Sequence, residues 1–331
     1  MINKTKSKYT WEGWESSGKE SWVFSVRHPC ELIGVHAKLI DNQLRESEKI
    51  ECCIYAPRIS STSTPFGLRV EESSSGVCVT DNRFIISKNR HIKDLEPSLF
   101  FISFDDILYL NIGRALLLGW FSITYAQGKE KKQIDILFSS IGRHHFEKAL
   151  RSYKKYQNAV NTDEYESESF SAAGFIHKIQ NKIHADSLKT LISSGEKLLC
   201  AFSCQYLWDK SFEKRSFFRK KKFFYYPQSK ATFLLTNKTL LLARDSLETG
   251  ITNGVDILTM SLGKIKAVSA IKENLNDSLI QRIKISLDQA AEEYLVEIPY
   301  LCENEDEEIL VNTIQSLVEN KKKGEETIGK L

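Results

Sequence analysis

The sequence has no long apolar segment and little net charge. Its longest apolar run, residues 115–121, follows Arg114 and is far shorter than the roughly 18 residues that a membrane-spanning helix needs. Residues 1–10 are polar and lack the apolar core and cleavage site of a signal peptide. The formal net charge of +3 is too small to make the whole surface attract polyanions, so only a local patch could do so. We expect a cytoplasmic protein without a transmembrane segment, with peripheral membrane binding as an open alternative.

Cysteine spacings typical of disulfide scaffolds or zinc sites are also missing. The chain has seven cysteines, an odd number, and no CxxC pair. Cys200 and Cys204 share one face of an alternating apolar stretch, which favours core thiols over metal ligands. His144 and His145 have no second Cys or His cluster near them in the sequence. We therefore predict neither a metal site nor a bound cofactor.

The local motifs of common enzyme classes are absent. The sequence contains no glycine-rich phosphate loop, no GxSxG elbow and no HExxH motif, and Gly263 with Lys264 lacks the preceding glycine spacing. We predict a protein that is not an enzyme. An unrecognised enzyme would have to bring scattered Asp, His, Cys or Ser side chains together in a polar pocket.

What the chain does have is one pattern that occurs twice. With 331 residues and 41% hydrophobic residues, it is long enough and apolar enough for two domains. Strand-like runs start at residues 50 and 198, each after a Glu-Lys pair, and are offset by 148 positions. A strand, a polar turn and a second strand follow at residues 76–86 and again at 232–242, with an offset of 156. The second copy therefore carries about eight extra residues before this hairpin.

Each copy continues with further strands and ends in an amphipathic helix. The strands are predicted at residues 101–105, 107–111, 116–126 and 133–138, and again at 257–262, 265–271, 280–287 and 294–298. Apolar residues at helical spacing then form one stripe in each copy. These residues are Phe146, Ala149, Leu150 and Tyr153 in the first copy, and Leu310, Ile314, Leu317 and Val318 in the second.

About seven strands followed by one amphipathic helix, twice in one chain, resembles a tandem pleckstrin-homology-like (PH-like or GRAM-like) protein. The resemblance covers roughly residues 30–155 and 185–320. It implies a mainly β fold with helices (α+β), in which two PH-like barrel or sandwich domains are each closed by the C-terminal helix. The chain would divide into an extension (1–28), a first domain (29–155), a linker and helix (156–184), a second domain (185–320) and a polar tail (321–331).

The extra residues of the second copy are basic and aromatic. Six of the nine positions from 214 to 222 are basic and aromatic residues accompany them, which is typical of loops that bind anionic lipid. The candidate binding residues are Lys214, Arg215, Phe217, Phe218, Arg219, Lys220, Lys221, Lys222, Phe223 and Phe224. PH domains that bind phosphoinositides carry a basic loop at this place, but their Lys/Arg-x-Arg motif is absent here. A solvated hairpin or an acidic protein partner remains open, whereas nucleic acid is disfavoured because no nucleic-acid-binding motif accompanies the segment.

A second candidate surface comes from the most apolar stretch, residues 113–121. The stretch is continuously apolar, as expected for a strand that is covered on both faces. We predict Leu116, Leu118 and Trp120 as interface residues, either between the two domains or in an oligomer. The sequence therefore favours a binding or adaptor protein that docks on an anionic membrane. The alternative is a protein-interaction scaffold that uses this stretch and the N-terminal tryptophans.

Overall fold

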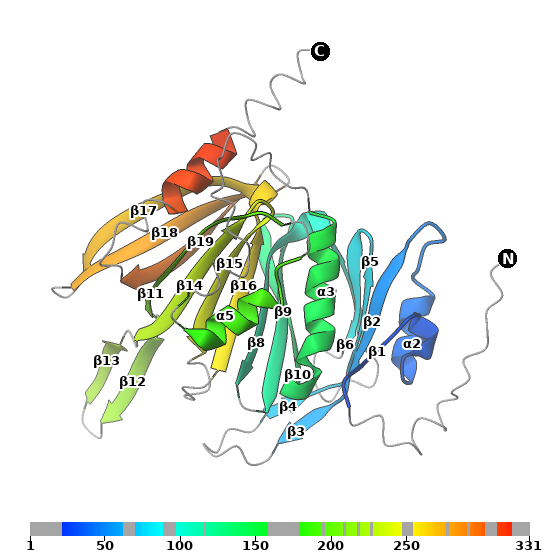
Figure 1. Cartoon of the computed structure of the whole chain (residues 1–331). Helices are drawn as coiled ribbons and strands as arrows, with labels where there is room; N and C mark the ends of the chain where they lie inside the picture. The colour runs from blue at the N-terminus through cyan, green and yellow to red at the C-terminus, as the bar shows by residue number, and fades with distance from the viewer. Residues whose placement is uncertain are drawn as a thin grey trace, which may run out of the picture. The chain divides into compact units, whose positions relative to one another are not determined.

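The chain folds mainly into antiparallel strands with a few helices, as expected for the α+β class (Figure 1). The computed structural model describes residues 22–61, 70–88, 97–115, 117–157, 179, 181–193, 196–207, 210–216, 219–225, 228–246, 254–275, 278–289, 292–301 and 310–319. The chain divides into two compact units, Met1–Tyr156 and Gln157–Leu331. The predicted extension up to residue 21, most of the predicted linker and the polar tail lie outside the described residues.

Unit 1 contains two antiparallel sheets. The first has the strand order β1-β2-β5-β6-β7. Its strands are β1 (Phe24–Val26), β2 (Ile50–Ala56), β5 (Ser75–Thr80), β6 (Arg83–Lys88) and β7 (Ser98–Ser103). The other strands form a meander, β8 (Ile107–Ala115), β9 (Leu118–Gln127) and β10 (Glu130–Ser139), and a small hairpin, β3 (Ile59–Ser61) with β4 (Val70–Glu72). Among the described strands no sheet closes on itself, so of the expected barrel or sandwich the closed barrel is not formed and the sheets are open.

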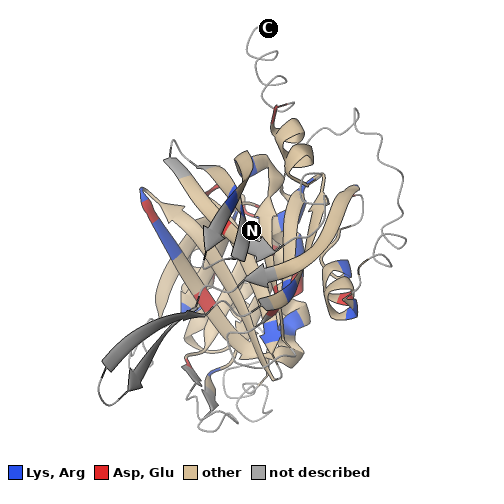
Figure 2. Cartoon of the chain, turned by 90° about the vertical axis from the view of Figure 1, so that its left-hand side faces the viewer, with Lys and Arg blue, Asp and Glu red and all other residues tan. Residues whose placement is uncertain are grey.

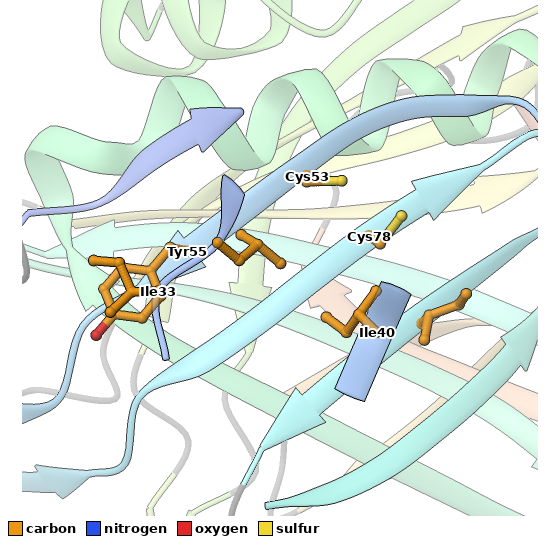
Figure 3. Packing of buried hydrophobic residues seen from close by; sticks show 7 residues of the cluster. Ile33, Ile40, Cys53, Tyr55 and Cys78 are labelled. Carbon is orange, nitrogen blue, oxygen red and sulfur yellow. The ribbon is translucent and has the colours of Figure 1, made fainter. Parts of the chain in front are cut away.

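Two helices pack against the strands of unit 1 and complete its core. Helix α3 (Arg143–Lys155) buries all four apolar residues of its predicted stripe. Helix α2 (Val35–Asp41) follows a 3₁₀ turn, η2 (Pro29–Glu31), and packs against β5 and β6. Figure 3 shows Ile40 of this helix close to Cys78, with Cys53, Tyr55 and Ile33 in the same cluster. The helices thus cover the apolar faces that the alternating strands present.

Unit 2 contains strands in the order β16-β15-β14-β11-β19-β18-β17. Its strands are β11 (Leu198–Leu207), β14 (Gln228–Thr236), β15 (Thr239–Ser246), β16 (Gly254–Ser261), β17 (Ile265–Leu275), β18 (Ser278–Gln289) and β19 (Glu292–Leu301). Helix α5 (Lys182–Lys189) packs against β15 and β16. A last helix occupies residues 310–319, and all four apolar residues of its predicted stripe are buried. The side chain of Gln315 in this helix donates a hydrogen bond of 3.0 Å to the carbonyl of Val268.

The two units share local irregularities at corresponding places. The ladder register shifts between Ile50 and Cys52 in β2, and between Leu198 and Cys200 in β11. A second pair of shifts occurs in β8 and in β17, each directly after a 3₁₀ turn, η3 (Phe104–Asp106) or η5 (Leu262–Lys264). In the tight turns after β5 and β14, Thr80 and Thr236 accept hydrogen bonds from backbone amides through their side-chain oxygens. Bulges of this kind bend a strand locally, so both units bend their sheets at the same points.

The close packing of β8 on β9 leads to a stability prediction. Gly113 lies directly opposite Trp120 in this ladder, and a Cβ atom at Gly113 would overlap the indole ring. We expect Gly113→Ala to lower the free energy of unfolding by about 1–3 kcal/mol, because the ring or the strand must move. Urea unfolding of both proteins measures this. Gly263→Ala is the matched control, since the nearest atom to its added Cβ is 3.8 Å away, and we expect a change within about 0.5 kcal/mol. Equal stability of wild type and Gly113→Ala would contradict the packing described.

Candidate functional site

The basic segment of unit 2 forms a β-hairpin. Strand β12 (Lys210–Ser216) pairs antiparallel with β13 (Arg219–Tyr225). We call residues 210–225 the basic hairpin. Its register places Lys214 opposite Lys221 and Arg215 opposite Lys220. Directly opposite positions on antiparallel strands are close neighbours, so like charges repel one another there.

The basic hairpin continues the ladder of β11 and β14 beyond the sheet (Figure 1). Leu207 lies opposite Gln228 at the end of that ladder, and Lys210 lies opposite Tyr225 at the start of the hairpin. Two positions separate the ladders on each strand, so the register continues without a slip. No third described strand pairs with β12 or β13. With seven residues per strand, the hairpin extends roughly 20 Å beyond the sheet.

The charge of the chain is concentrated in this hairpin. Residues 210–225 contain seven basic residues and one acidic residue, a formal charge of +6, whereas the whole chain carries +3. The remainder of the chain therefore carries −3, by subtraction over the same 331 residues. Outside the hairpin, basic and acidic residues are interspersed over the described ribbon (Figure 2). The basic hairpin is accordingly the strongest candidate for an attraction to a polyanion.

The predicted binding residues occupy both strands of the hairpin. All six predicted basic residues lie on β12 or β13, and Phe223 and Phe224 lie on β13. Phe217 and Phe218, between the strands in sequence, lie outside the described residues. The expected loop is thus a paired ribbon. No alternation of polar and apolar residues signals these two strands, because the basic and aromatic residues of the second strand stand in blocks, at 219–222 and 223–225.

Unit 1 carries a shorter hairpin at the corresponding place, between β2 and β5. Its strands β3 and β4 also keep the register of the preceding ladder, because Ile59 lies opposite Glu72 just beyond the pair Ala56 and Ser75. Residues 57–74 contain two basic and two acidic residues, so their net charge is zero. Glu72 forms an ion pair with Lys88 of β6. The projecting hairpin is common to both units, and the concentrated positive charge is specific to unit 2.

A buried polar cluster lies at the base of the basic hairpin. His184 of α5 is fully buried, and its Nε2 lies 3.0 Å from Oδ1 of Asp245. A carboxylate only accepts, so Nε2 carries the proton and donates it. The Nδ1 atom lies 3.1 Å from Oγ1 of Thr232, which is 3.3 Å from Oγ of Ser203. We call these residues, together with Asn181, the His184 network.

Asp245 connects this network to the strand that leads out of the hairpin. Its Oδ2 atom accepts a hydrogen bond of 3.1 Å from the backbone amide of Lys230, and Asn181 contacts Oδ1 at 3.5 Å. Burial raises the pKa of Asp245, but the hydrogen bond and charge of His184 and the bonds from Lys230 and Asn181 outweigh it and hold this pKa below its usual value. The carboxylate therefore fastens β14, β15 and α5 to one another where the hairpin begins.

Unit 1 has a histidine at the matching position without a carboxylate. His36 of α2 precedes His184 by 148 positions, the same offset as the first strands. Its ring nitrogens lie 2.9 Å from Oγ of Ser87 and 3.0 Å from Oγ of Ser74. Burial lowers the pKa of His36 to about 4, so the ring is neutral near pH 7. Gly76 leaves the space for this ring, since an added Cβ would lie 2.8 Å from Cβ of His36.

Among the described residues, no group of three or more His, Cys, Asp or Glu side chains is placed so that it could hold a metal ion. Cys53 lies directly opposite Cys78 in the core, and both are fully buried. Burial raises the pKa of Cys52 and of Cys200 to about 12, which keeps these thiols protonated and unreactive. Within the described part of the chain, no helix is both long enough and apolar enough to cross a membrane.

The predicted interface residues are distributed differently from the expectation. Trp120 is only 8% exposed and packs across Gly113 within unit 1. Leu118 is half-buried, and Leu116 lies outside the described residues. Among the described apolar residues of this stretch, Leu117 is the most exposed, at 79%, and it was not among the predicted interface residues. The turn between β8 and β9 explains its exposure.

No family model matches this chain. No curated protein matches it significantly. The function must therefore be argued from the charge, register and burial of its own residues.

The buried histidine of unit 1 predicts a pH-dependent stability. A folded-state pKa of about 4, below the unfolded value near 6.5, gives stability that is fully present above pH 6.5 and is lost as the pH falls toward 4. The expected loss from His36 is about 3 kcal/mol. We expect His36→Gln to flatten this part of the curve of unfolding free energy against pH. Val35→Gln, at an exposed position of the same helix, is the control and should keep the wild-type slope, whereas an unchanged slope in His36→Gln would rule out this role.

The carboxylate of unit 2 predicts a loss of stability in the same direction of pH, but at a lower pH than that of His36. We expect Asp245→Asn to lower the unfolding free energy by about 1.5–3 kcal/mol near pH 7, because charged hydrogen bonds are lost. Since the pKa of Asp245 is lowered on folding, its contribution is present above about pH 4 and disappears as the pH falls through the folded-state pKa. The gap between variant and wild type should therefore close below about pH 4. Asp186→Asn, at an exposed position on α5, serves as the control and should track the wild type throughout.

Proposed function

We propose that this protein is a non-enzymatic binding or adaptor protein that docks on anionic lipid surfaces through the basic hairpin. The observation that carries the proposal is the concentration of charge: the hairpin holds +6 while the remainder of the chain holds −3. A projecting basic ribbon on an otherwise slightly acidic protein suits contact with an anionic plane at one point.

The length of the hairpin supports this mode of contact. Charges separated by more than the Debye length of about 8 Å at physiological ionic strength are largely screened from one another. A hairpin of roughly 20 Å can touch the surface with its outer half while the acidic remainder stays beyond that distance. Each Lys or Arg near an anionic leaflet contributes about 1 kcal/mol, and Phe or Tyr residues favour the headgroup region. Both kinds occur in the hairpin, where the basic block 219–222 is followed by the aromatic block 223–225.

We include in the proposal that each unit is a PH-like module, and the strand order of each unit supports this. In unit 1 the strands β2, β5, β6 and β7 are followed by the meander β8 to β10 and by α3. In unit 2 the strands β11, β14, β15 and β16 are followed by β17 to β19 and by the helix at 310–319. Four strands, three strands and a final helix is the order that the resemblance implies. The shared bulges and 3₁₀ turns favour two copies of one module.

A vesicle sedimentation experiment tests the proposal. The hairpin variant replaces all six basic residues at 214, 215 and 219–222 with Ala, and it is compared with wild type on vesicles of neutral lipid with 0–40% phosphatidylserine. We expect wild-type binding to rise with anionic lipid and to fall with salt, and the variant to bind at least about a hundredfold more weakly. Binding that is equal in both proteins would refute the role of the hairpin.

The matched control removes the same charge elsewhere. It replaces six exposed lysines that lie outside the hairpin, Lys38, Lys129, Lys182, Lys189, Lys266 and Lys272. Both variants have a formal net charge of −3, by subtraction of six from +3. If net charge alone governed binding, the two variants would behave alike. If the control variant still binds, the effect is located in the basic hairpin. If single-stranded nucleic acid competes for the hairpin more strongly than lipid does, the ligand is a nucleic acid and the membrane proposal fails.

A further inference from the structure

Three large apolar side chains are exposed at one end of unit 1. Trp22 is 59% exposed, Leu117 is 79% exposed and Ile141 is 63% exposed. We call them the apolar knob. Exposed apolar residues that occur singly need no explanation, but a group of them usually marks a contact surface.

The three residues come together because their segments pack on one another. The backbone amide of Ser140, next to Ile141, donates a hydrogen bond of 2.8 Å to the carbonyl of Leu117. The side chain of Val23, next to Trp22, fills the space beside Gly142 where a Cβ atom would lie. The start of β1, the turn between β8 and β9, and the turn η4 (Ser140–Gly142) therefore meet at this end.

The knob stands on a rigid base. Phe138 of β10 occupies the space beside Gly119 of β9 and stacks on Phe146 of α3 with ring centroids 4.2 Å apart. Both phenylalanines are fully buried. The knob thus lies beside a buried aromatic stack of the core of unit 1.

The surroundings of the knob include one exposed arginine, Arg114. The segments 22–26, 114–122 and 139–146 contain no Asp or Glu. They do contain Arg114 and His144, which are both exposed, and Arg143, which pairs with Glu147. An apolar tip beside an exposed arginine, in segments without an acidic residue, complements the headgroup region of an anionic bilayer, where Trp is also favoured.

We propose that the apolar knob inserts into the interface of an anionic bilayer as a second membrane contact, independent of the basic hairpin. The inference rests on the proposed function, since it assigns the same target surface to unit 1. A protein partner fits less well, because a stable interface needs about 20–30 residues on each side and the knob is a convex group of three.

The test compares exposed apolar residues inside and outside the knob. The knob variant is Leu117→Ser with Ile141→Ser, and the control variant is Ile183→Ser with Leu295→Ser, at positions that are 46% and 51% exposed in unit 2. All four positions are exposed, so we expect all proteins to remain folded. On vesicles with 30% phosphatidylserine, we expect the knob variant to bind about ten- to a hundredfold more weakly at high salt. The control variant should bind like the wild type.

Salt separates the two contacts. The hairpin contributes a salt-sensitive part of the affinity, and insertion of the knob contributes a part that persists at 0.5 M salt, where charges are screened. A polarity-sensitive fluorophore on Leu117→Cys gives a direct readout, and its emission should shift to the blue only with vesicles. Equal binding of the knob and control variants, or a fluorophore that stays in water, would overturn the inference.

The outcomes also separate this inference from the proposed function. If the hairpin variant loses binding and the knob variant does not, the proposed function stands and the knob is not a membrane contact. If the knob variant alone loses binding, the knob stands and the role of the hairpin fails. If no protein binds vesicles, both fail. A wild type that forms dimers in light scattering, with a monomeric knob variant, would assign the knob to a second copy of the chain and overturn the lipid contact.

Discussion

The register of the first strand pair in each unit is the constraint on which the other features depend. In unit 2 the ladder between β11 and β14 places Ser203 opposite Thr232 and puts Phe202 on the buried face. A slip by one residue would exchange the two faces of the strand. Phe202 would then be exposed, and Ser203 would no longer reach the His184 network. The same register continues into the basic hairpin, so one set of hydrogen bonds determines the core, the polar cluster and the position of the charges.

The two units place a buried histidine at corresponding positions but give it different hydrogen-bond partners. In each unit a short helix before the first long strand presents a buried histidine to serine or threonine hydroxyls on or next to the neighbouring strands. In unit 1 the partners are neutral, and burial keeps His36 uncharged near neutral pH. In unit 2 the partner Asp245 also binds the amide of Lys230, at the root of the long basic hairpin. A charged anchor is stronger than a neutral one, and it occurs where the projecting ribbon is longer and charged.

Sequence patterns predicted the elements but not the tertiary contacts between them. The helical stripes were predictable because Phe146, Ala149, Leu150 and Tyr153 follow the period of an α-helix, and all are buried. The His184 network was not predictable, because residues 184, 203, 232 and 245 form no local motif. The one available signal was the offset of 148 between His36 and His184, which equals the offset between the first strands of the two copies. The apolar stretch was read as one covered strand. Its division into β8 and β9 at residues 116–117 exposes Leu117 and buries Trp120, and the flanking Gly113 and Gly119 hinted at that close packing.

The like charges of the basic hairpin destabilise it, and an anionic ligand would reduce this destabilisation. A two-stranded ribbon is marginally stable alone in water, and like charges at directly opposite positions destabilise it further. The Cβ atoms at such positions lie about 5 Å apart, which is shorter than the Debye length of about 8 Å. The continuous ladder from β11 and β14 supplies the register that the ribbon itself cannot maintain. An anionic surface would neutralise the like charges that lie opposite each other on the two strands. Binding would therefore stabilise the paired hairpin, and a paired hairpin would bind more strongly. The sheet and the His184 network thus lie at the base of a ribbon in which Glu213, opposite Lys222, is the single acidic residue among seven basic ones.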